Sequence, residues 1–154
     1  MEIKATLEKP YTESQRLDFI VEENHNNGYE IKETEIALEA WGYTEEEKDQ
    51  QERERIAQLH LTRGDVFRAL LLARQVTRAQ IKALIEAMPD GTPEEQIAKE
   101  YALIDFEESL DFYRGVQLID TLGAQLGISP EAMTQFFETN DWHYLVADTR
   151  DQEV

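Results

Sequence analysis

The chain of 154 residues contains no cysteine, which excludes a disulfide framework and a thiolate zinc site. Glycine and proline are few, at 7 and 4 residues, so the composition does not match that of a disordered linker. No apolar stretch approaches the roughly 20 residues of a membrane span, and the first residues lack the apolar run of a signal peptide. We therefore expect a folded protein of the cytoplasm, or of a particle assembled there.

Basic residues are also scarce, because 15 Lys and Arg stand against 33 Asp and Glu, for a net charge of -18. Nucleic acids and anionic membranes normally require a basic surface, so binding to either is disfavoured. The acidity fits a basic partner, or a role limited to keeping the protein soluble. Residues 1–50 carry a net charge of -9, residues 51–88 of +3 and residues 89–154 of -12. This pattern predicts that the basic middle faces acidic surfaces, within the chain or in a neighbouring copy.

The beginning of the chain combines strand and helix signals. Glu2–Leu7 and Tyr29–Lys32 have the pattern of two short strands that pair with each other. Between them, a capping box at Thr12 is expected to start a helix. Residues 38–42 are interpreted as a closing helical turn. We therefore predict a small α/β or mostly helical unit over residues 1–43.

The rest of the chain is predicted to be a series of helices. No apolar residue occurs from Glu45 to Arg55, so residues 44–61 are expected to form a solvated connector helix. This helix is the best candidate for a domain boundary. Residues 62–147 are predicted to form a bundle of about five helices, because their apolar residues recur at helical spacing. The polar tail over residues 148–154 is expected to fray. The expected fold class is mostly α.

One of these predicted helices has an unusually wide apolar face. Thr92 is expected to cap it, with Pro93 at its first position, and the helix is expected to run to Arg114. Its large apolar residues are Ile97, Tyr101, Leu103, Ile104, Phe106, Leu110 and Tyr113.

The same predicted helix carries a row of carboxylates. Asp105, Glu108 and Asp111 recur every three residues, with Glu107 adjacent, and so are expected to fall near one helix face. Such a row could imitate phosphates and bind an arginine-rich nucleic-acid-binding protein. The simpler interpretation is a solvated face.

Two aromatic residues form a second candidate binding feature. Trp41 and Tyr43 lie just before the acidic run Glu45–Glu47. They are interpreted as a partner-facing aromatic edge. The alternative is that they seal a small core.

No motif predicts catalysis or a metal site. His25, His60 and His143 are far apart, and Glu22 with His25 is an isolated E-x-x-H, whereas a di-iron site needs a second such pair. A nucleophile elbow, a Walker loop and a dinucleotide fingerprint are all absent. We therefore predict a non-enzyme with no metal and no cofactor.

The stretch from Leu118 to Phe137 has the helix–glycine turn–helix pattern of a DNA-reading motif. Its second helix, Ser129–Glu138, contains no Lys or Arg and carries two acids. Such a helix cannot reach phosphates with a positive charge. We therefore interpret the stretch as a helical hairpin used for packing.

Several short blocks of the sequence resemble a known group of proteins. The blocks are Lys9–Thr12, Asp18–Val21, Asn24–His25, Gly28–Ile31, Leu38–Gly42, Arg55–Leu59, Leu61–Thr62, Phe112–Gly115 and Leu118–Asp120. Together they resemble short proteins encoded in phages and prophages of Gram-positive gut bacteria, often among tail genes. The matching residues are packing and capping residues, so the resemblance implies a gene neighbourhood and not a chemistry.

These observations lead to one expected function and one alternative. The expected function is that of a non-catalytic, phage-encoded accessory of virion or tail assembly. It is expected to bind a phage structural protein, in the host cytoplasm or in the virion. A homo-oligomer is compatible with this role. The alternative is an acidic anti-defence inhibitor, of the anti-CRISPR or DNA-mimic type, that binds a basic host nucleic-acid-binding protein. Neither version binds nucleic acid or a membrane directly.

Overall fold

The computed structural model describes residues 1–146. The chain divides into two compact units, Met1–Arg53 and Glu54–Val154, which are described separately below. Helices make up most of the described residues, which confirms the mostly-α fold class. Among these residues, no helix has the length and apolarity needed to cross a membrane. The tail predicted to fray, residues 148–154, lies outside the described part.

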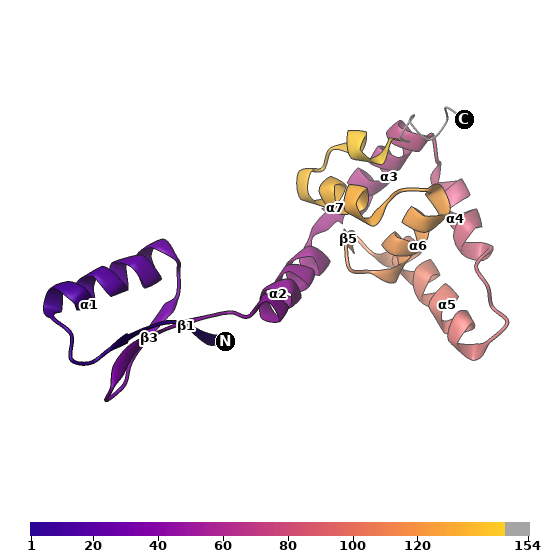
Figure 1. Ribbon diagram of the computed structural model, residues 1–154. Coiled ribbons are helices and arrows are strands. Elements are labelled where there is room, and N and C mark those ends of the chain that lie inside the picture. Colours follow the sequence, from indigo (N-terminus) through magenta and orange to yellow (C-terminus); the bar gives the residue numbers. More distant parts are fainter. Residues whose placement is uncertain (147–154) are drawn as a thin grey trace, which may run out of the picture. The chain divides into compact units, whose positions relative to one another are not determined.

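The first unit is a three-stranded antiparallel sheet with one helical segment. Its elements are β1 (Glu2–Glu8), α1 (Glu13–Ile20), the π-helical turn η1 (Val21–Asn26), β2 (Glu30–Glu33) and β3 (Ala37–Gly42). The strand order is β1-β3-β2, and α1 lies over one face of the sheet (Figure 1). Both predicted strands are therefore confirmed, but the expectation that they pair with each other was wrong, because each pairs with β3.

Residues 38–42 belong to the central strand, so the predicted helical turn at this position was wrong. Leu38 and Ala40 are fully buried on the face that α1 covers, and Glu39 and Trp41 alternate with them on the opposite face. Leu38 lies opposite Leu7 on β1 and opposite Glu33 on β2. A short apolar run fits a strand or a helical turn equally well. Here the hydrogen bonds to two neighbouring strands decide the conformation.

Threonine residues cap the first two α-helices, and the capping box at Thr12 was predicted from the sequence. Thr12 forms a capping box with Gln15 at the start of α1. Thr44 does the same before α2 (Glu45–Gln58), where its N–H donates to the Glu47 carboxylate over 2.8 Å and its hydroxyl accepts from the Glu47 N–H. No residue of α2 is buried, as expected of a solvated helix.

The described residues of the second unit, up to residue 146, form five more helices and a two-stranded sheet. Its elements are β4 (His60–Thr62), α3 (Arg63–Arg74), α4 (Arg78–Glu86), α5 (Pro93–Glu108), β5 (Asp111–Tyr113), α6 (Gln117–Leu126), α7 (Pro130–Thr139) and the 3-10 turn η2 (Trp142–Leu145). Helix α4 packs against α5 and α6, α6 packs against α7, and η2 packs against α3 and α7. The rings of Phe67, Phe106 and Phe112 meet in the core that these elements enclose.

Helix α5 begins where the sequence predicted, with Thr92 as its cap and Pro93 in its first turn. It ends at Glu108, so the expectation that it continues to Arg114 was wrong. Ser109 is extended, and Phe112 on β5 is buried opposite Leu61 of β4. Strand pairing and the burial of Phe112 override the helical pattern that residues 93–108 begin.

Two bases of the basic middle pair with acids of the second unit, in agreement with the charge pattern. Lys82 on α4 pairs with Glu107 on α5 at 3.0 Å. Arg55, at the end of α2, pairs with Glu138 on α7 at 2.6 Å. Both pairs join the basic middle, residues 51–88, to the acidic block that follows it.

Candidate protein-binding surface

Helix α5 exposes an apolar stripe to solvent. Its residues Ala102 and Phe106 are buried against the rest of the unit. Ile97, Tyr101 and Ile104 follow one another at i, i+4 and i+7, and 56%, 64% and 41% of their surfaces are exposed. Residues at this spacing lie on one side of a helix. The wide apolar face is therefore two faces, of which one packs on the core and the other is open.

This open stripe is framed by four carboxylates: Glu94, Glu100, Asp105 and Glu108. Side chains that are three or four residues apart on a helix are neighbours. Glu94 and Glu100 therefore border Ile97, Asp105 borders Tyr101, and Glu108 borders Ile104. Within residues 1–146, none of the four makes an ion pair. We call the three apolar residues and these four acids together the α5 outer face.

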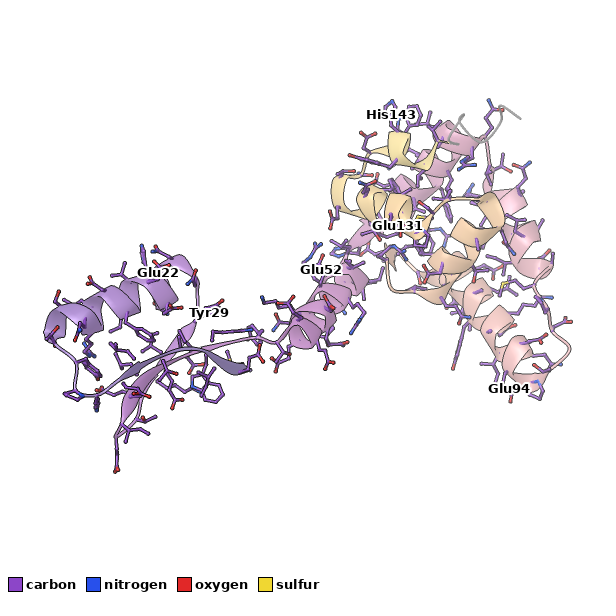
Figure 2. All side chains as sticks on the ribbon, in the orientation of Figure 1. Glu22, Tyr29, Glu52, Glu94, Glu131 and His143 are labelled. Carbon is purple, nitrogen blue, oxygen red and sulfur yellow. The ribbon has the colours of Figure 1, made fainter. Side chains whose placement is uncertain are left out.

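Helix α5 lies at the edge of the second unit in Figure 1. Figure 2 labels Glu94, which lies in its first turn at the outer end of the helix. Of the neighbouring helices, α4 and α6 contact α5. The α5 outer face is thus a continuous surface of one element, held in place by the burial of the opposite side of the same helix.

The structure separates the four acids that the sequence placed in one row. Asp105 and Glu108 belong to the α5 outer face. Glu107 pairs with Lys82 instead, and the hydrogen bond to Glu107 raises the pKa of the Lys82 ammonium. Asp111 lies on β5, beyond the end of the helix. A single helical row of carboxylates from residue 105 to residue 111 is therefore not present.

Trp41 and Tyr43 belong to the first unit, whereas these acids belong to the second. Trp41 is half-buried on the sheet face opposite to α1, where its Nε1–H donates to Glu39 over 2.9 Å. The Lys32 ammonium lies 4.8 Å from the centre of the Trp41 ring. Ile3, the cross-strand neighbour of Trp41, is 48% exposed. Trp41 is therefore held by its own strands, and Tyr43 is exposed just after β3.

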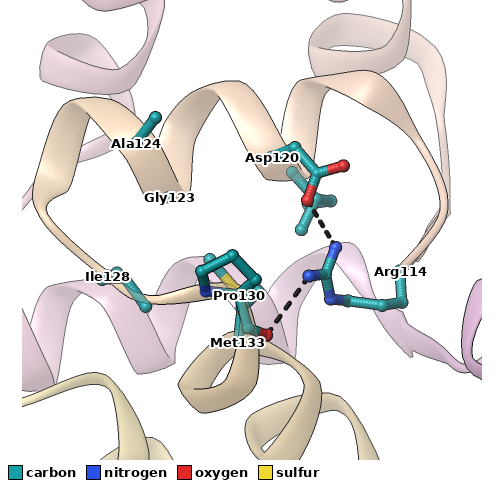
Figure 3. Close-up of a pocket in the computed structure, with 8 residues that line it drawn as sticks. Arg114, Asp120, Gly123, Ala124, Ile128, Pro130 and Met133 are labelled. Atoms are coloured by element: carbon teal, nitrogen blue, oxygen red, sulfur yellow. Dashed lines mark hydrogen bonds and ion pairs between the residues drawn. The ribbon is translucent and has the colours of Figure 1, made fainter.

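A cavity of about 410 Å³ lies between α6 and α7 (Figure 3). Its charged wall is the buried guanidinium of Arg114, which donates to Thr134 Oγ1 at 3.1 Å, to Asp120 Oδ1 at 2.7 Å and to the Pro130 carbonyl at 3.3 Å. These three partners occupy both terminal nitrogens and Nε. Arg114 therefore holds α6 and α7 against each other through three of its five N–H donors.

The helix–turn–helix pattern is confirmed as a packed hairpin. Gly127, with φ +70°, ends α6, and Ser129 caps α7. Leu122 on α6 and Phe136 on α7 are both buried. Among residues 1–146, no group of three or more His, Asp or Glu side chains is placed to hold a metal ion.

Comparison of the chain with protein-family models, with curated proteins and with solved structures finds no match. The interpretation of the α5 outer face therefore rests on its own side chains. Sequence reasoning identified Asp105 and Glu108 but missed Glu94, Glu100 and the exposure of the stripe. The signal that could have found them is the width of the apolar face, since a helix packed on one side needs apolar residues on one side only.

Proposed function

We propose that this chain is a non-catalytic, phage-encoded protein that acts by binding another protein, as an accessory of virion assembly associated with the tail. In this proposal a small N-terminal unit precedes a bundle of about five helices, and the helical unit carries the contact surface. The phage assignment comes from the resemblance of the sequence blocks described above.

The observation that carries the proposal is the exposure of Ile97, Tyr101 and Ile104 on one side of α5. Single exposed apolar residues are common, but a contiguous stripe bordered by polar residues is typical of a protein-binding surface. Tyr101 supplies the large, amphipathic ring that is enriched in such contacts. Covering this stripe removes apolar surface from water and so favours association.

The test is affinity purification of the tagged chain from infected cells, followed by identification of the co-purified proteins by mass spectrometry. The expected result is a phage structural protein in the wild-type eluate, and its depletion when Ile97→Ser and Tyr101→Ser are combined. The chain is also expected in virions or in assembly intermediates. Its absence from both would refute the assembly role.

A second candidate function is an acidic anti-defence inhibitor that binds a basic host nucleic-acid-binding protein. The observation that favours it is the set of four carboxylates on α5 without ionic partners among residues 1–146. A pull-down from uninfected host lysate separates the two functions, because only the inhibitor should recover a host nuclease or regulator there. Its binding should weaken with added salt, since salt screens charge–charge attraction.

A further inference from the structure

We infer that the α5 outer face receives a basic amphipathic helix of the partner protein. This inference rests on the proposed protein-binding function and specifies the chemistry of the partner. Its basis is the combination of an apolar stripe with unpaired acids on both flanks and at both ends, in a helix whose other side is buried.

The shape of the surface favours a helix as the occupant. At a rise of 1.5 Å per residue, the segment from Glu94 to Glu108 extends about 21 Å, or four helical turns. Its apolar residues lie one turn apart, and a second helix presents apolar side chains at the same interval. A partner helix with apolar residues at i, i+4 and i+7 can therefore cover Ile97, Tyr101 and Ile104 together.

The charge of the surface favours basic residues beside the partner's apolar stripe. Glu94 and Glu108 stand at the two ends of the α5 outer face, and Glu100 and Asp105 stand on its two sides. A Lys or Arg near each of them would meet an opposite charge that has no partner within residues 1–146. Pairs at the rim of an interface add little affinity, but they raise the association rate and select among partners. The net charge of -18 adds attraction at longer range.

The same charges argue against a second copy of this chain on the α5 outer face. Two α5 helices packed stripe to stripe would bring eight carboxylates together around one small apolar contact. Like charges placed opposite each other across an interface strongly disfavour association. A nucleic acid is repelled for the same reason, because the frame around the stripe is uniformly acidic.

The inference is tested with a synthetic peptide of Leu and Lys that has Leu at i, i+3, i+4 and i+7, and with a scrambled isomer of equal composition. The labelled full-length chain is titrated with each peptide, and the affinity and the shifts of the backbone amide signals are recorded by NMR. We expect the amphipathic peptide to bind at least tenfold more tightly than its isomer. We also expect the largest shifts in α5.

Two pairs of matched variants locate the binding. Ile97→Ser with Tyr101→Ser should weaken peptide binding about tenfold, whereas Leu72→Ser, at an apolar residue of α3 that is 60% exposed, should not change it. Replacing Glu94, Glu100 and Glu108 by Gln should reduce the salt dependence of binding. The control replaces the exposed residues Glu8, Glu35 and Glu131 by Gln, which changes the net charge by the same amount. Peptide binding by this control should keep the salt dependence of the wild type.

Three results of the peptide titrations would overturn the inference: equal binding of the two peptides, the largest shifts outside α5, or equal effects of the two Gln variants. A failure of the inference is distinguishable from a failure of the proposed function. If the Ile97→Ser, Tyr101→Ser chain loses the peptide but still co-purifies with a phage structural protein, the partner uses another surface. The inference about α5 is then wrong, while the role in assembly stands through that other surface.

Discussion

Gly115 and Ala57 meet backbone to backbone, and the Gly115 N–H donates to the Ala57 carbonyl over 3.2 Å. A Cβ added at Gly115 would lie 2.8 Å from the Ala57 Cβ and 3.1 Å from its Cα. The next residue back, Arg114, donates its own N–H to the Leu59 carbonyl over 2.7 Å. The end of α2 is thus fastened to the segment that leads into α6.

Gly115→Ala is therefore expected to destabilise the second unit. The added methyl group must displace backbone, and overpacking of this kind costs about 1–3 kcal/mol. The measurement is chemical denaturation followed by the fluorescence of Trp142 in a Trp41→Phe background. Gly91→Ala is the control, because its nearest atom is a Glu95 carboxylate oxygen at 4.0 Å. Equal stability of the two variants would contradict the close approach.

Arg114→Lys is expected to lower the stability of the second unit by about 1–3 kcal/mol, because polar groups that the guanidinium satisfies lose their donor. A lysine ammonium has no planar fork and cannot reach the Asp120 carboxylate, the Thr134 hydroxyl and the Pro130 carbonyl together. Thermal unfolding followed by circular dichroism measures the change. Arg78→Lys, at an exposed position, should stay within about 0.5 kcal/mol of the wild type.

Substitutions on the two sides of α5 should differ strongly in how much stability they cost. Phe106→Ala removes a buried ring and should cost about 3–5 kcal/mol, whereas Ile97→Ser with Tyr101→Ser should change the free energy of unfolding by less than about 1 kcal/mol. Urea denaturation of the isolated chain tests both. A large loss of stability in the Ser variant would show that the stripe packs within the chain, and would remove the basis for a binding surface.

The stability of the first unit should depend on pH through Tyr11 and Glu33. The Tyr11 hydroxyl donates to the Glu33 carboxylate over 2.6 Å. This bond, followed by the bond from Lys9, lowers the pKa of Glu33, and the same bond to Glu33 raises the pKa of Tyr11. The contribution of Glu33 is complete above its ordinary pKa of about 4.5 and is lost as the pH falls through its lower folded-state pKa. The contribution of Tyr11 is complete below about 10 and is lost as the pH rises through its higher folded-state pKa.

The stability difference between wild type and Tyr11→Phe should therefore be constant between these two limits and shrink beyond each of them. Trp41 fluorescence in a Trp142→Phe background reports the unfolding of this unit at each pH. Tyr43→Phe serves as the control and should behave as the wild type, because the Tyr43 hydroxyl makes no hydrogen bond within residues 1–146. A difference that persists unchanged below pH 4 would rule out the contribution assigned to Glu33.

The parts of the fold that local chemistry determines were predictable from the sequence. The threonine caps at Thr12 and Thr92 were identified correctly, because a cap depends on residues three positions apart. The strand at residues 37–42 and the end of α5 at Glu108 were missed. Both depend on pairing with segments distant in the chain, which a local pattern does not contain.

The candidate surface was only partly predictable for a related reason. Asp105 and Glu108 were identified from their spacing, but the same spacing was extended to Asp111, which lies on a strand. Whether an apolar side chain of α5 is buried or open depends on which side of the helix α4 and α6 occupy. The sequence pattern gives the width of the apolar face, but it does not show which half is buried and which is exposed.

The carboxylates around the apolar stripe also have a consequence for the behaviour of the free protein in solution. They oppose self-association through the stripe, since two molecules that approach by this face repel each other before their apolar residues touch. At about 1 M salt the screening length falls to roughly 3 Å, and this protection is largely lost. A concentrated solution should then associate reversibly with added sodium chloride, and substitutions that bring lysine into the frame would promote aggregation.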